Sequence, residues 1–456
     1  MYIMNLRFPT LLILCFAVYG LQAQDWPQFL GPDRNSTSPQ KNLLRSWPEE
    51  GPEVLWTIPV GIGYGGPVVK DGKIYLLDRI DSIGDNLRCF DLNSGEELWN
   101  FGYECPGSVM FPGSRSVPIV DGNLVYSCGP YGDLYCIDVD THQPLWNHNV
   151  WTDFGGISGV GKEAGFDGSG GRGKFPTWAI SQCPLVYGDL LILASQAPEA
   201  GLVAYDKKTG ELKWKSPPLG EVGYVSPSVV NIDGAAHVVM VTASGGGRGG
   251  NPVVPGKIVG MDPHSGKVFW EYADWICRIP IPSAVDAGEN RVLVVGGYEL
   301  GAVMIRVEKD EDGNYKTTEL FKTEEFGDQT KPPIFYKGYF YAQFGTNNKR
   351  DGLICMSMDG EIMWKTKRDP DFNKGSMILA DGLILATDGA RTLYLIDPDP
   401  EGFEPLASAE LLGDAQGSED PAATRSGTQN WAPIALAEGK LLIRDRGQLK
   451  CVVVAE

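Results

Sequence analysis

The sequence is poor in the residues from which metal and redox sites are built. None of its four histidines lies at a spacing typical of zinc ligands. Its nine cysteines include no adjacent pair and no Cys-x-x-Cys motif. We therefore predict no metal-binding residues and no dithiol redox centre.

Positive charge is also scarce. Lys and Arg number 39 against 58 Asp and Glu, which gives a formal net charge of −19. An acidic surface repels phosphate backbones, so we expect no nucleic-acid partner. The glycine-rich stretch 245–250 lacks the strand-to-helix Gly-x-Gly-x-x-Gly context of a dinucleotide site. The sequence also lacks the Gly-x-Ser-x-Gly motif that would indicate a hydrolase.

The amino end carries a hydrophobic stretch. Arg7 precedes an apolar run over residues 8–19, and Ala23 offers a small residue for cleavage. This three-part pattern predicts a signal peptide over residues 1–23 and a periplasmic or secreted protein. Lipidation at Cys15 is not expected, because the large Leu14 precedes it. No later stretch reaches the roughly 18 apolar residues of a membrane-spanning helix.

Turn residues are abundant, and they mark a repeat. The chain has 58 glycines and 32 prolines, which favours many short strands joined by turns. One unit has a hairpin over 67–76 and then the segment 89–99, Cys-Phe-Asp-Leu-Asn-Ser-Gly-Glu-Glu-Leu-Trp. Similar units start at Pro118, Pro184, Pro227, Pro282, Pro333, Met377 and Pro433. Each unit predicts a four-stranded blade, and blades arranged in a ring form a β-propeller.

The number of units predicts how the ring closes. Eight inner hairpins indicate an all-β, eight-bladed propeller of four-stranded antiparallel blades. Seven blades are the alternative, because the units starting at Pro282 and Met377 are degenerate, and the former has lost its tryptophan. The last unit ends at Val454 without an outer strand, whereas 54–57 has the outer-strand pattern. We predict that 54–57 completes the last blade and removes a free sheet edge.

Four cysteines occupy one slot of the repeat, namely Cys89, Cys136, Cys355 and Cys451. A repeated slot favours a small buried apolar side chain. We expect the closing tryptophan of a unit to pack over this slot, between neighbouring blades. The other cysteines after the signal peptide are Cys105, Cys128, Cys183 and Cys277. Export is compatible with one disulfide among them, and the sequence does not pair them.

The repeat resembles that of a known family. The pattern Ala/Cys-x-Asp-x-x-Ser/Thr-Gly-x-x-x-Trp is similar to the tryptophan-docking repeat of pyrroloquinoline quinone (PQQ) propellers, in the quinoprotein alcohol dehydrogenase-like superfamily. It is matched at 89–99, at 204–214 and, with Gly260 in the first place, at 260–270. The second unit departs from it, with His142 in place of the glycine. The segment 25–36 resembles the leader of secreted PQQ-like proteins.

The resemblance implies two functional classes. Quinoprotein dehydrogenases hold PQQ and Ca²⁺ in the propeller centre and oxidise alcohols or sugars, whereas other members, including a scaffold of outer-membrane protein assembly, lack the cofactor. This chain has neither the vicinal cysteines nor the Cys-x-x-Cys-His haem motif that many of the dehydrogenases carry. We predict a binding or scaffold module for a protein, glycan or small ligand, with no cofactor and no catalysis of its own. The alternative is a PQQ- and Ca²⁺-dependent dehydrogenase.

The repeat also predicts a ligand site. Equal positions in rotated blades face a common axis, so the segments that enter the inner strands should lie near the mouth of the central channel. Cations and aromatic rings there are suited to an anionic or planar ligand. We predict a binding site, without catalytic residues, that comprises Arg115, Trp178, Ser181, Gln182, Tyr224, Arg278, Lys331, Lys374 and Asn430, beside Gln429 and Trp431.

The predicted organisation is simple. After the signal peptide we expect a leader segment over residues 24–53 and a single PQQ-like propeller domain over residues 54–456. We expect this domain to act as a monomer, without a transmembrane segment.

Overall fold

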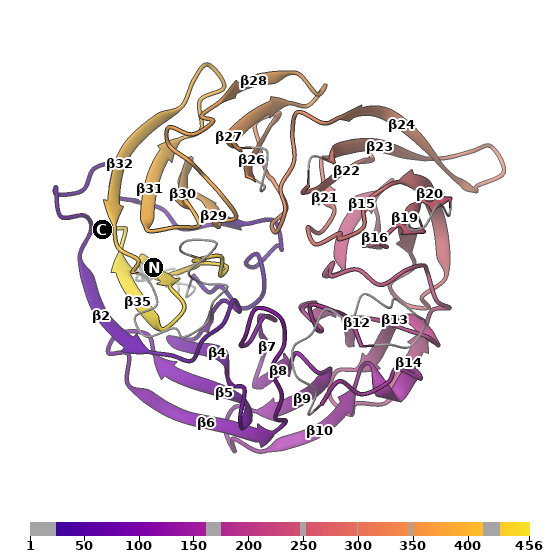
Figure 1. Ribbon diagram of the computed structural model, residues 1–456, viewed down its shortest axis with the longest axis horizontal. Coiled ribbons are helices and arrows are strands. Elements are labelled where there is room, and N and C mark those ends of the chain that lie inside the picture. The colour runs from indigo at the N-terminus through magenta and orange to yellow at the C-terminus, as the bar shows by residue number, and fades with distance from the viewer. Residues whose placement is uncertain (1–23, 161–174, 247–251, 299, 346–349, 414–428) are drawn as a thin grey trace, which may run out of the picture.

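The repeat units form the blades of a closed ring (Figure 1). The computed structural model describes residues 24–160, 175–246, 252–298, 300–345, 350–413 and 429–456, and the signal peptide predicted over 1–23 lies outside them. In these ranges the chain forms eight four-stranded antiparallel blades, so the eight-bladed prediction is confirmed. The described helical structure is one 3-10 turn, η1 (Thr152–Phe154). Within these residues no helix is long and apolar enough to cross a membrane.

The blades follow one another in chain order. The strands of each blade are given from the channel outward. Blade 1 comprises β3 (Val68–Lys70), β4 (Lys73–Ile80), β5 (Gly84–Asp91) and β6 (Glu97–Glu104), and blade 2 comprises β7 (Ile119–Asp121), β8 (Leu124–Cys128), β9 (Asp133–Asp138) and β10 (Pro144–Asn149). Blade 3 comprises β11 (Leu185–Tyr187), β12 (Leu190–Ala197), β13 (Ala200–Asp206) and β14 (Leu212–Lys215), and blade 4 comprises β15 (Ser228–Ile232), β16 (Ala235–Val241), β19 (Gly256–Met261) and β20 (Val268–Trp275). In blade 4 a small hairpin of β17 (Gly245–Gly246) and β18 (Val253–Val254) extends the connection between β16 and β19.

The second half of the ring repeats this order. Blade 5 comprises β21 (Val285–Asp286), β22 (Arg291–Gly296), β23 (Gly301–Lys309) and β24 (Tyr315–Thr323). Blade 6 comprises β25 (Ile334–Tyr336), β26 (Tyr339–Gly345), β27 (Arg350–Ser357) and β28 (Ile362–Lys365), and blade 7 comprises β29 (Met377–Ala380), β30 (Leu383–Thr387), β31 (Thr392–Asp397) and β32 (Glu404–Glu410). The inner three strands of blade 8 are β33 (Ala435–Ala437), β34 (Lys440–Arg444) and β35 (Gln448–Val453).

The two ends of the chain close the ring, as the sequence predicted. The outer strand of blade 8 is β2 (Val54–Pro59), which pairs antiparallel with β35. Trp56 lies opposite Cys451, and Thr57 lies opposite Lys450. This pairing covers a sheet edge that β35 would otherwise expose.

Several closing tryptophans join one blade to the next. The ring of Trp146 lies against Gly210 of blade 3, where an added Cβ atom would come within 2.7 Å of the indole. The Trp146 indole also donates a hydrogen bond to the carbonyl oxygen of Lys207 at 3.3 Å. Gly210 has a φ of +74°, so glycine suits this turn on both sterics and backbone conformation. The motif therefore encodes the contact between blades as well as the strands within one blade.

Two blades reach the same contact with other residues. The ring of Trp99 stacks on His142, which replaces the glycine in blade 2, at a centroid distance of 4.8 Å. In blade 5, Phe321 takes the place of the missing tryptophan, and its ring lies against Gly360 of blade 6. The unit that starts at Pro282 therefore keeps an aromatic contact, although its sequence looks degenerate.

All eight cysteines in the described part of the chain are buried and unpaired. Those of the repeated slot have no solvent-exposed surface, as expected for a small apolar side chain. Burial raises the pKa of the Cys89 thiol to about 12 and has the same effect on Cys451. Thiols that stay protonated are poor nucleophiles, so these cysteines act as core residues.

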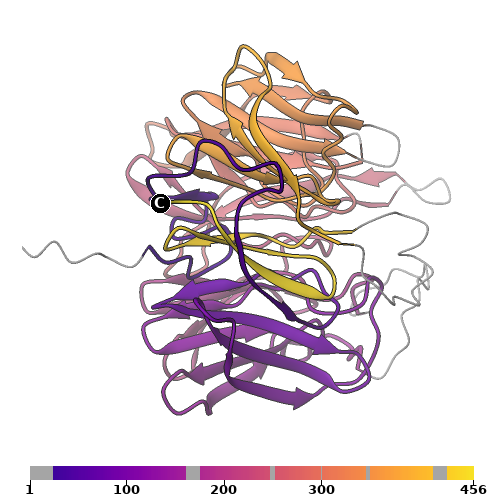
Figure 2. The same ribbon diagram turned by 90° about the vertical axis from the view of Figure 1, so that its left-hand side faces the viewer.

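The leader runs across the inner strands from blade to blade. Trp26 pairs with Val69 of blade 1, and β1 (Thr37–Ser38) adds a parallel strand to β29 of blade 7. Figure 2 shows this indigo segment on the left-hand side of the disc, on the same side as the carboxyl end. Between these contacts Arg34 donates hydrogen bonds to the carbonyl oxygens of Pro184 and Pro227, at 2.8 and 3.0 Å. The leader therefore occupies part of the central channel.

Candidate functional site

The segments that enter the inner strands surround a cavity of about 790 Å³. Its lining comes from the leader and from blade connections around the whole ring. The lining residues are Phe29, Tyr64, Phe111, Arg115, Val117, Trp178, Ser181, Cys183, Tyr224, Ser226, Ile279, Ile281, Tyr298, Gln329, Thr330, Lys331, Lys374, Trp431 and Pro433. This volume is typical of sites for small molecules.

Three cations line this cavity. Arg115 donates hydrogen bonds to the carbonyl oxygens of Met110, Phe111 and Trp178. Lys331 donates one to the carbonyl oxygen of Trp431 at 2.8 Å, and the Lys374 ammonium lies 4.8 Å from the centroid of the Trp431 ring. Within the described residues, none of the three cations forms an ion pair with a carboxylate.

Burial changes the protonation of these cations. Desolvation lowers the pKa of Lys331 to about 8 and the pKa of Arg115 to about 10, and it also lowers the pKa of Lys374. A buried ammonium loses hydration, and the contacts of Lys331 and Lys374 with Trp431, together with the nearby charge of Asp328, replace only part of it. An anion entering the cavity would restore the lost stabilisation.

One buried carboxylate lies near Lys331 but does not line the cavity. Asp328 accepts hydrogen bonds from the backbone N–H groups of Thr330 and Lys331, at 2.8 and 3.0 Å, and from that of Gln343 at 3.2 Å. Desolvation raises its pKa to about 6. Asp328 therefore shapes the loop that carries Lys331, and from outside the cavity lining its charge raises the pKa of Lys331 and Lys374 against the larger effect of desolvation.

Aromatic rings form two groups on the cavity wall. Tyr64 and Trp431 stack at a centroid distance of 5.6 Å, and Phe111 lies 5.9 Å from Trp431 and 6.2 Å from Tyr64. In the other group, Trp178 and Tyr224 meet edge to face at 5.5 Å. Rings with few rotatable bonds give a preformed apolar wall for a flat ligand.

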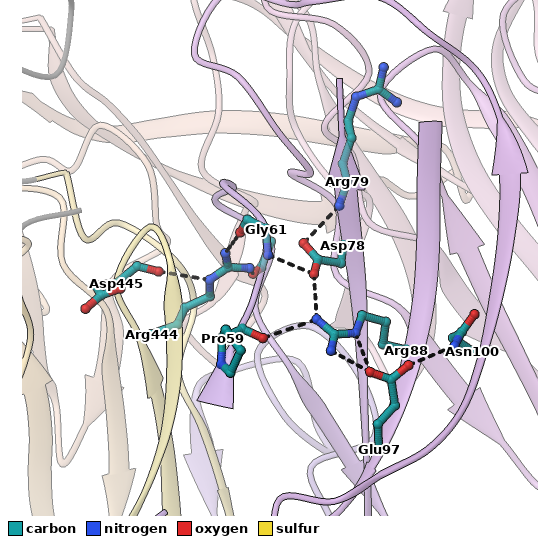
Figure 3. A network of polar contacts seen from close by, with 10 residues as sticks. Pro59, Gly61, Asp78, Arg79, Arg88, Glu97, Asn100, Arg444 and Asp445 are labelled. Atoms are coloured by element: carbon teal, nitrogen blue, oxygen red, sulfur yellow. Dashed lines mark hydrogen bonds and ion pairs between the residues drawn. The ribbon is translucent and has the colours of Figure 1, made fainter. Parts of the chain in front are cut away.

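A polar network fixes the segment that presents Tyr64. Arg444 of blade 8 donates hydrogen bonds to the carbonyl oxygens of Gly61 and Gly65, at 2.7 and 3.1 Å. The amide of Gly61 donates to Asp78, which also pairs with Arg88 at 3.1 Å (Figure 3). These contacts tie blade 8 to blade 1 on both sides of the segment, so Tyr64 is positioned by the closure of the ring.

The structure brings together most, but not all, of the predicted site residues. Six of the nine line the cavity, namely Arg115, Trp178, Ser181, Tyr224, Lys331 and Lys374. Arg278 does not line it, and its side chain is exposed. Gln182 is buried and donates to the carbonyl oxygen of Gly223 at 3.1 Å, and Asn430 donates to that of Gly413 at 3.2 Å. The side-chain amides of Gln182 and Asn430 therefore hold the backbone of the connections by hydrogen bonds.

Sequence reasoning missed several lining residues. Phe29 comes from the leader, where no repeat position marks it, and Tyr298 lies in the connection between β22 and β23. Tyr64 and Phe111 lie in segments that enter inner strands, so the positional rule that selected Arg115 could have found them. Tyr64 lies three residues before Pro67, the same offset that Tyr224 has before Pro227, so applying the rule to every blade would have included it.

The lining does not suit a calcium ion. No described residue that lines the cavity carries a carboxylate, and the described residues hold no cluster of three or more His, Cys, Asp or Glu placed for a metal. Ca²⁺ takes six to eight oxygen ligands, among which carboxylates are usual. Three cations in the same cavity would also repel a divalent ion.

Sequence comparison finds relatives of the chain. A PQQ-repeat family model described as outer membrane protein assembly factor BamB matches residues 40–160 and 84–311. The quinoprotein ethanol dehydrogenase of Pseudomonas aeruginosa is 24% identical over 178 residues, which cover 38% of this chain and 24% of that protein. The quinohemoprotein alcohol dehydrogenase of Comamonas testosteroni is 22% identical over 254 residues, which cover 46% and 32%. The chain thus spans less than a third of the length of either relative.

Solved structures share the architecture. A europium-containing methanol dehydrogenase superposes with a TM-score of 0.62 at 12% identity, covering 94% of this chain and 98% of that one. BamB from Moraxella catarrhalis superposes with a TM-score of 0.51 at 11% identity, covering 88% and 96%. At such identities the likeness shows the fold alone, and it extends to enzymes as well as to an assembly factor.

Proposed function

Because the chain belongs to the PQQ-repeat family described as outer membrane protein assembly factor BamB, whose fold does not decide activity, we propose a function from the cavity itself. The protein is an exported binding module that takes a small anionic ligand at the mouth of its channel and carries out no reaction on it. The observation that carries this proposal is a set of three cations, the half-buried Arg115 and the buried Lys331 and Lys374, without a carboxylate among the described lining residues.

The charge of the whole chain makes this set informative. In a protein with a net charge of −19, buried cations would be expected to pair with some of the 58 acidic residues. Arg115, Lys331 and Lys374 instead contact carbonyl oxygens and an aromatic ring. An anionic ligand is the simplest partner for charges arranged in this way.

The shape of the site favours a small molecule over a protein or a glycan. A concave cavity of about 790 Å³ encloses a ligand of drug size, whereas protein partners usually contact broader and flatter surfaces. Binding then requires one copy of the chain, since the lining described above comes from a single ring. We therefore keep the monomer in the proposal, together with export through the predicted signal peptide.

The second candidate function is that of a PQQ- and Ca²⁺-dependent dehydrogenase. Its support is the similarity to quinoprotein alcohol dehydrogenases. Against it stands the lining, which offers cations where a calcium ion needs oxygen ligands. We rank it second for this reason and derive no reaction step from it.

Binding measurements test the proposed function. Isothermal titration calorimetry of the purified protein with citrate, adipate and naphthalene-2,6-dicarboxylate should detect binding of at least one anion. Arg115→Gln should weaken it about tenfold, which corresponds to about 1.4 kcal/mol. Arg278→Gln is the matched control, because Arg278 lies in an equivalent segment but outside the cavity. Ethanol oxidation by the protein supplied with PQQ and CaCl₂, measured with an electron-accepting dye, would overturn the claim that no reaction occurs.

A further inference from the structure

The leader carries a charged side chain into the channel. The guanidinium of Arg34 donates hydrogen bonds to the carbonyl oxygens of Pro184 and Pro227, at 2.8 and 3.0 Å. The side-chain oxygen of Gln28 accepts a further one at 3.3 Å. These partners are neutral, and in the described part of the chain no carboxylate forms an ion pair with Arg34. Desolvation lowers the pKa of the half-buried Arg34 to about 10, so the side chain is still charged at neutral pH.

Arg34 lies directly behind residues that line the cavity, although it does not line the cavity itself. Its guanidinium carbon is 5.9 Å from the centre of the Phe29 ring. The two prolines that it contacts follow Cys183 and Ser226 in the chain, and the amide of Cys183 donates to the hydroxyl of Ser226 at 2.8 Å. Phe29, Cys183 and Ser226 all line the cavity, and we refer to them as the leader wall.

The charge of Arg34 acts on a group of this wall. Burial raises the pKa of the Cys183 thiol, and the backbone N–H of Val117 together with the positive charge of Arg34 opposes this effect. Phe29 and Cys183 lie between the guanidinium and the cavity, so protein atoms separate the charge from a ligand there. Screening by bulk water and salt is weak across such a wall. An anion in the cavity would therefore be attracted by Arg34 as well.

We propose that the leader forms part of the ligand site, and that the charge of Arg34 strengthens the binding of an anion from behind the leader wall. This inference rests on the proposed function and adds to it a residue that does not touch the ligand. It also couples two events. Because the docked leader raises the affinity for the anion, a bound anion must favour the docked leader to the same extent.

The leader is held in an unusual backbone conformation. Leu30, Arg34 and Ser36 have φ values of +63°, +53° and +61°, which residues other than glycine rarely adopt. Such a backbone persists only where its surroundings fix it. The carbonyl oxygen of Ser36 accepts a hydrogen bond from the amide of Leu379 in blade 7 at 2.8 Å, while Arg34 reaches blades 3 and 4 across the channel. Docking of the leader thus depends on contacts that surround the cavity.

The alternative role of Arg34 is purely structural. The planar fork of an arginine can donate to two carbonyl oxygens at once, so Arg34 could serve only to link blades 3 and 4. In that case its loss would lower the stability of the fold and leave the affinity for anions unchanged. A guanidinium that is removed from water without a carboxylate partner is, however, costly for a structural link alone. An anion in the cavity offsets part of this cost.

Calorimetry of two variants separates the charge of Arg34 from its hydrogen bonds. Each of citrate, adipate and naphthalene-2,6-dicarboxylate that binds the wild-type protein should bind Arg34→Gln about fivefold more weakly, because the charge is removed. Arg34→Lys keeps the charge but not the planar fork, so it should restore most of the affinity. Arg45→Gln is the matched control. Arg45 also belongs to the leader, but its side chain is 54% exposed and pairs with Asp381 at 2.8 Å, so the affinity should not change.

Hydrogen exchange of the wild-type protein measures the coupling. The amides of Val120 and Leu379 donate to the leader at the carbonyl oxygens of Pro27 and Ser36, at 2.9 and 2.8 Å, so their exchange reports on undocking. Saturation with the tightest-binding of the three anions should slow this exchange about fivefold or more. The slowing should be smaller in Arg34→Gln.

The outcomes separate this inference from the proposed function. If Arg34→Gln binds the anions as tightly as the wild-type protein, or if Arg34→Lys binds them as weakly as Arg34→Gln, the inference fails and the anion site stands. Exchange that does not respond to the anion would overturn the coupling, and this measurement needs no variant that might unfold. If none of the three anions binds the wild-type protein, the proposed function itself fails. Melting curves establish that each variant is folded at the temperature of the titration.

Discussion

The indole of Trp270 donates a hydrogen bond to Nδ1 of His237 at 2.8 Å, and Nε2 of the same imidazole lies 3.2 Å from the hydroxyl of Tyr315. Because Nδ1 accepts, the proton of the neutral ring sits on Nε2, which donates to the tyrosine oxygen. His237 has no exposed surface, and burial lowers its pKa. The hydrogen bond between Trp270 and His237 holds the indole within blade 4, where the Trp270 ring lies against Gly260.

This pair predicts loss of stability in acid. The folded protein keeps His237 neutral, whereas the unfolded chain binds a proton below about pH 6.5, so the free energy of unfolding should fall as the pH drops below that value. The free energy of unfolding should therefore be lower at pH 5 than at pH 7. Urea denaturation at both pH values measures it. His237→Gln should remove that part of the pH dependence, and an equal loss in both proteins would assign the effect to other groups.

The closing tryptophans should contribute strongly to stability. Trp99, Trp214 and Trp270 are 9%, 9% and 3% exposed, and each packs against a glycine or a histidine. Replacing any one of them by Ala should lower the free energy of unfolding by roughly 3–5 kcal/mol, the range for large-to-small changes in a core. Leu212→Ala is the control, because Leu212 lies on an outer strand and is 42% exposed. Chemical denaturation that gives similar values for Trp214→Ala and Leu212→Ala would contradict the docking role.

Ring closure by the amino-terminal strand should be measurable by truncation. Without residues 24–58, β35 loses its partner β2 and the inner strands lose the leader. We expect a decrease in melting temperature of about 5 °C or more. A shorter truncation of 24–53 keeps β2 and separates the two contributions. Calorimetric melting curves of both truncated variants that coincide with that of the full-length protein would show that ring closure does not contribute to stability.

Anion binding in the cavity should weaken in alkaline solution. Burial lowers the pKa of Lys331 to about 8, so its ammonium is charged below this pH and becomes neutral above it. An anionic ligand favours the charged form, and its affinity should therefore fall as the pH rises from 7 to 9. Titration of naphthalene-2,6-dicarboxylate at several pH values measures the profile. Lys331→Arg keeps its charge over this range and should flatten the profile; a steep profile in that variant would point to another titrating group.

Much of this architecture can be predicted from the sequence because the repeat is local. The turn residues mark every blade and the regular tryptophans mark most of them, and the missing outer strand of the last unit identifies 54–57 as its complement. The positional rule for the channel mouth selected Arg115, Lys331 and Lys374, since equal positions in rotated blades face one axis. It failed for Arg278, because the direction of a side chain in a long connection depends on its neighbours.

The sequence by itself favoured eight blades over seven, and it determined the closure of the ring and the segments that surround the channel. Only the tertiary structure decided which of their side chains form the cavity. Phe29 comes from the leader, Tyr64 from the entry to blade 1 and Trp431 from the entry to blade 8. They line one cavity only because the leader enters the channel and blade 8 joins blade 1. No local pattern records such contacts, since they depend on packing between elements that the ring brings together.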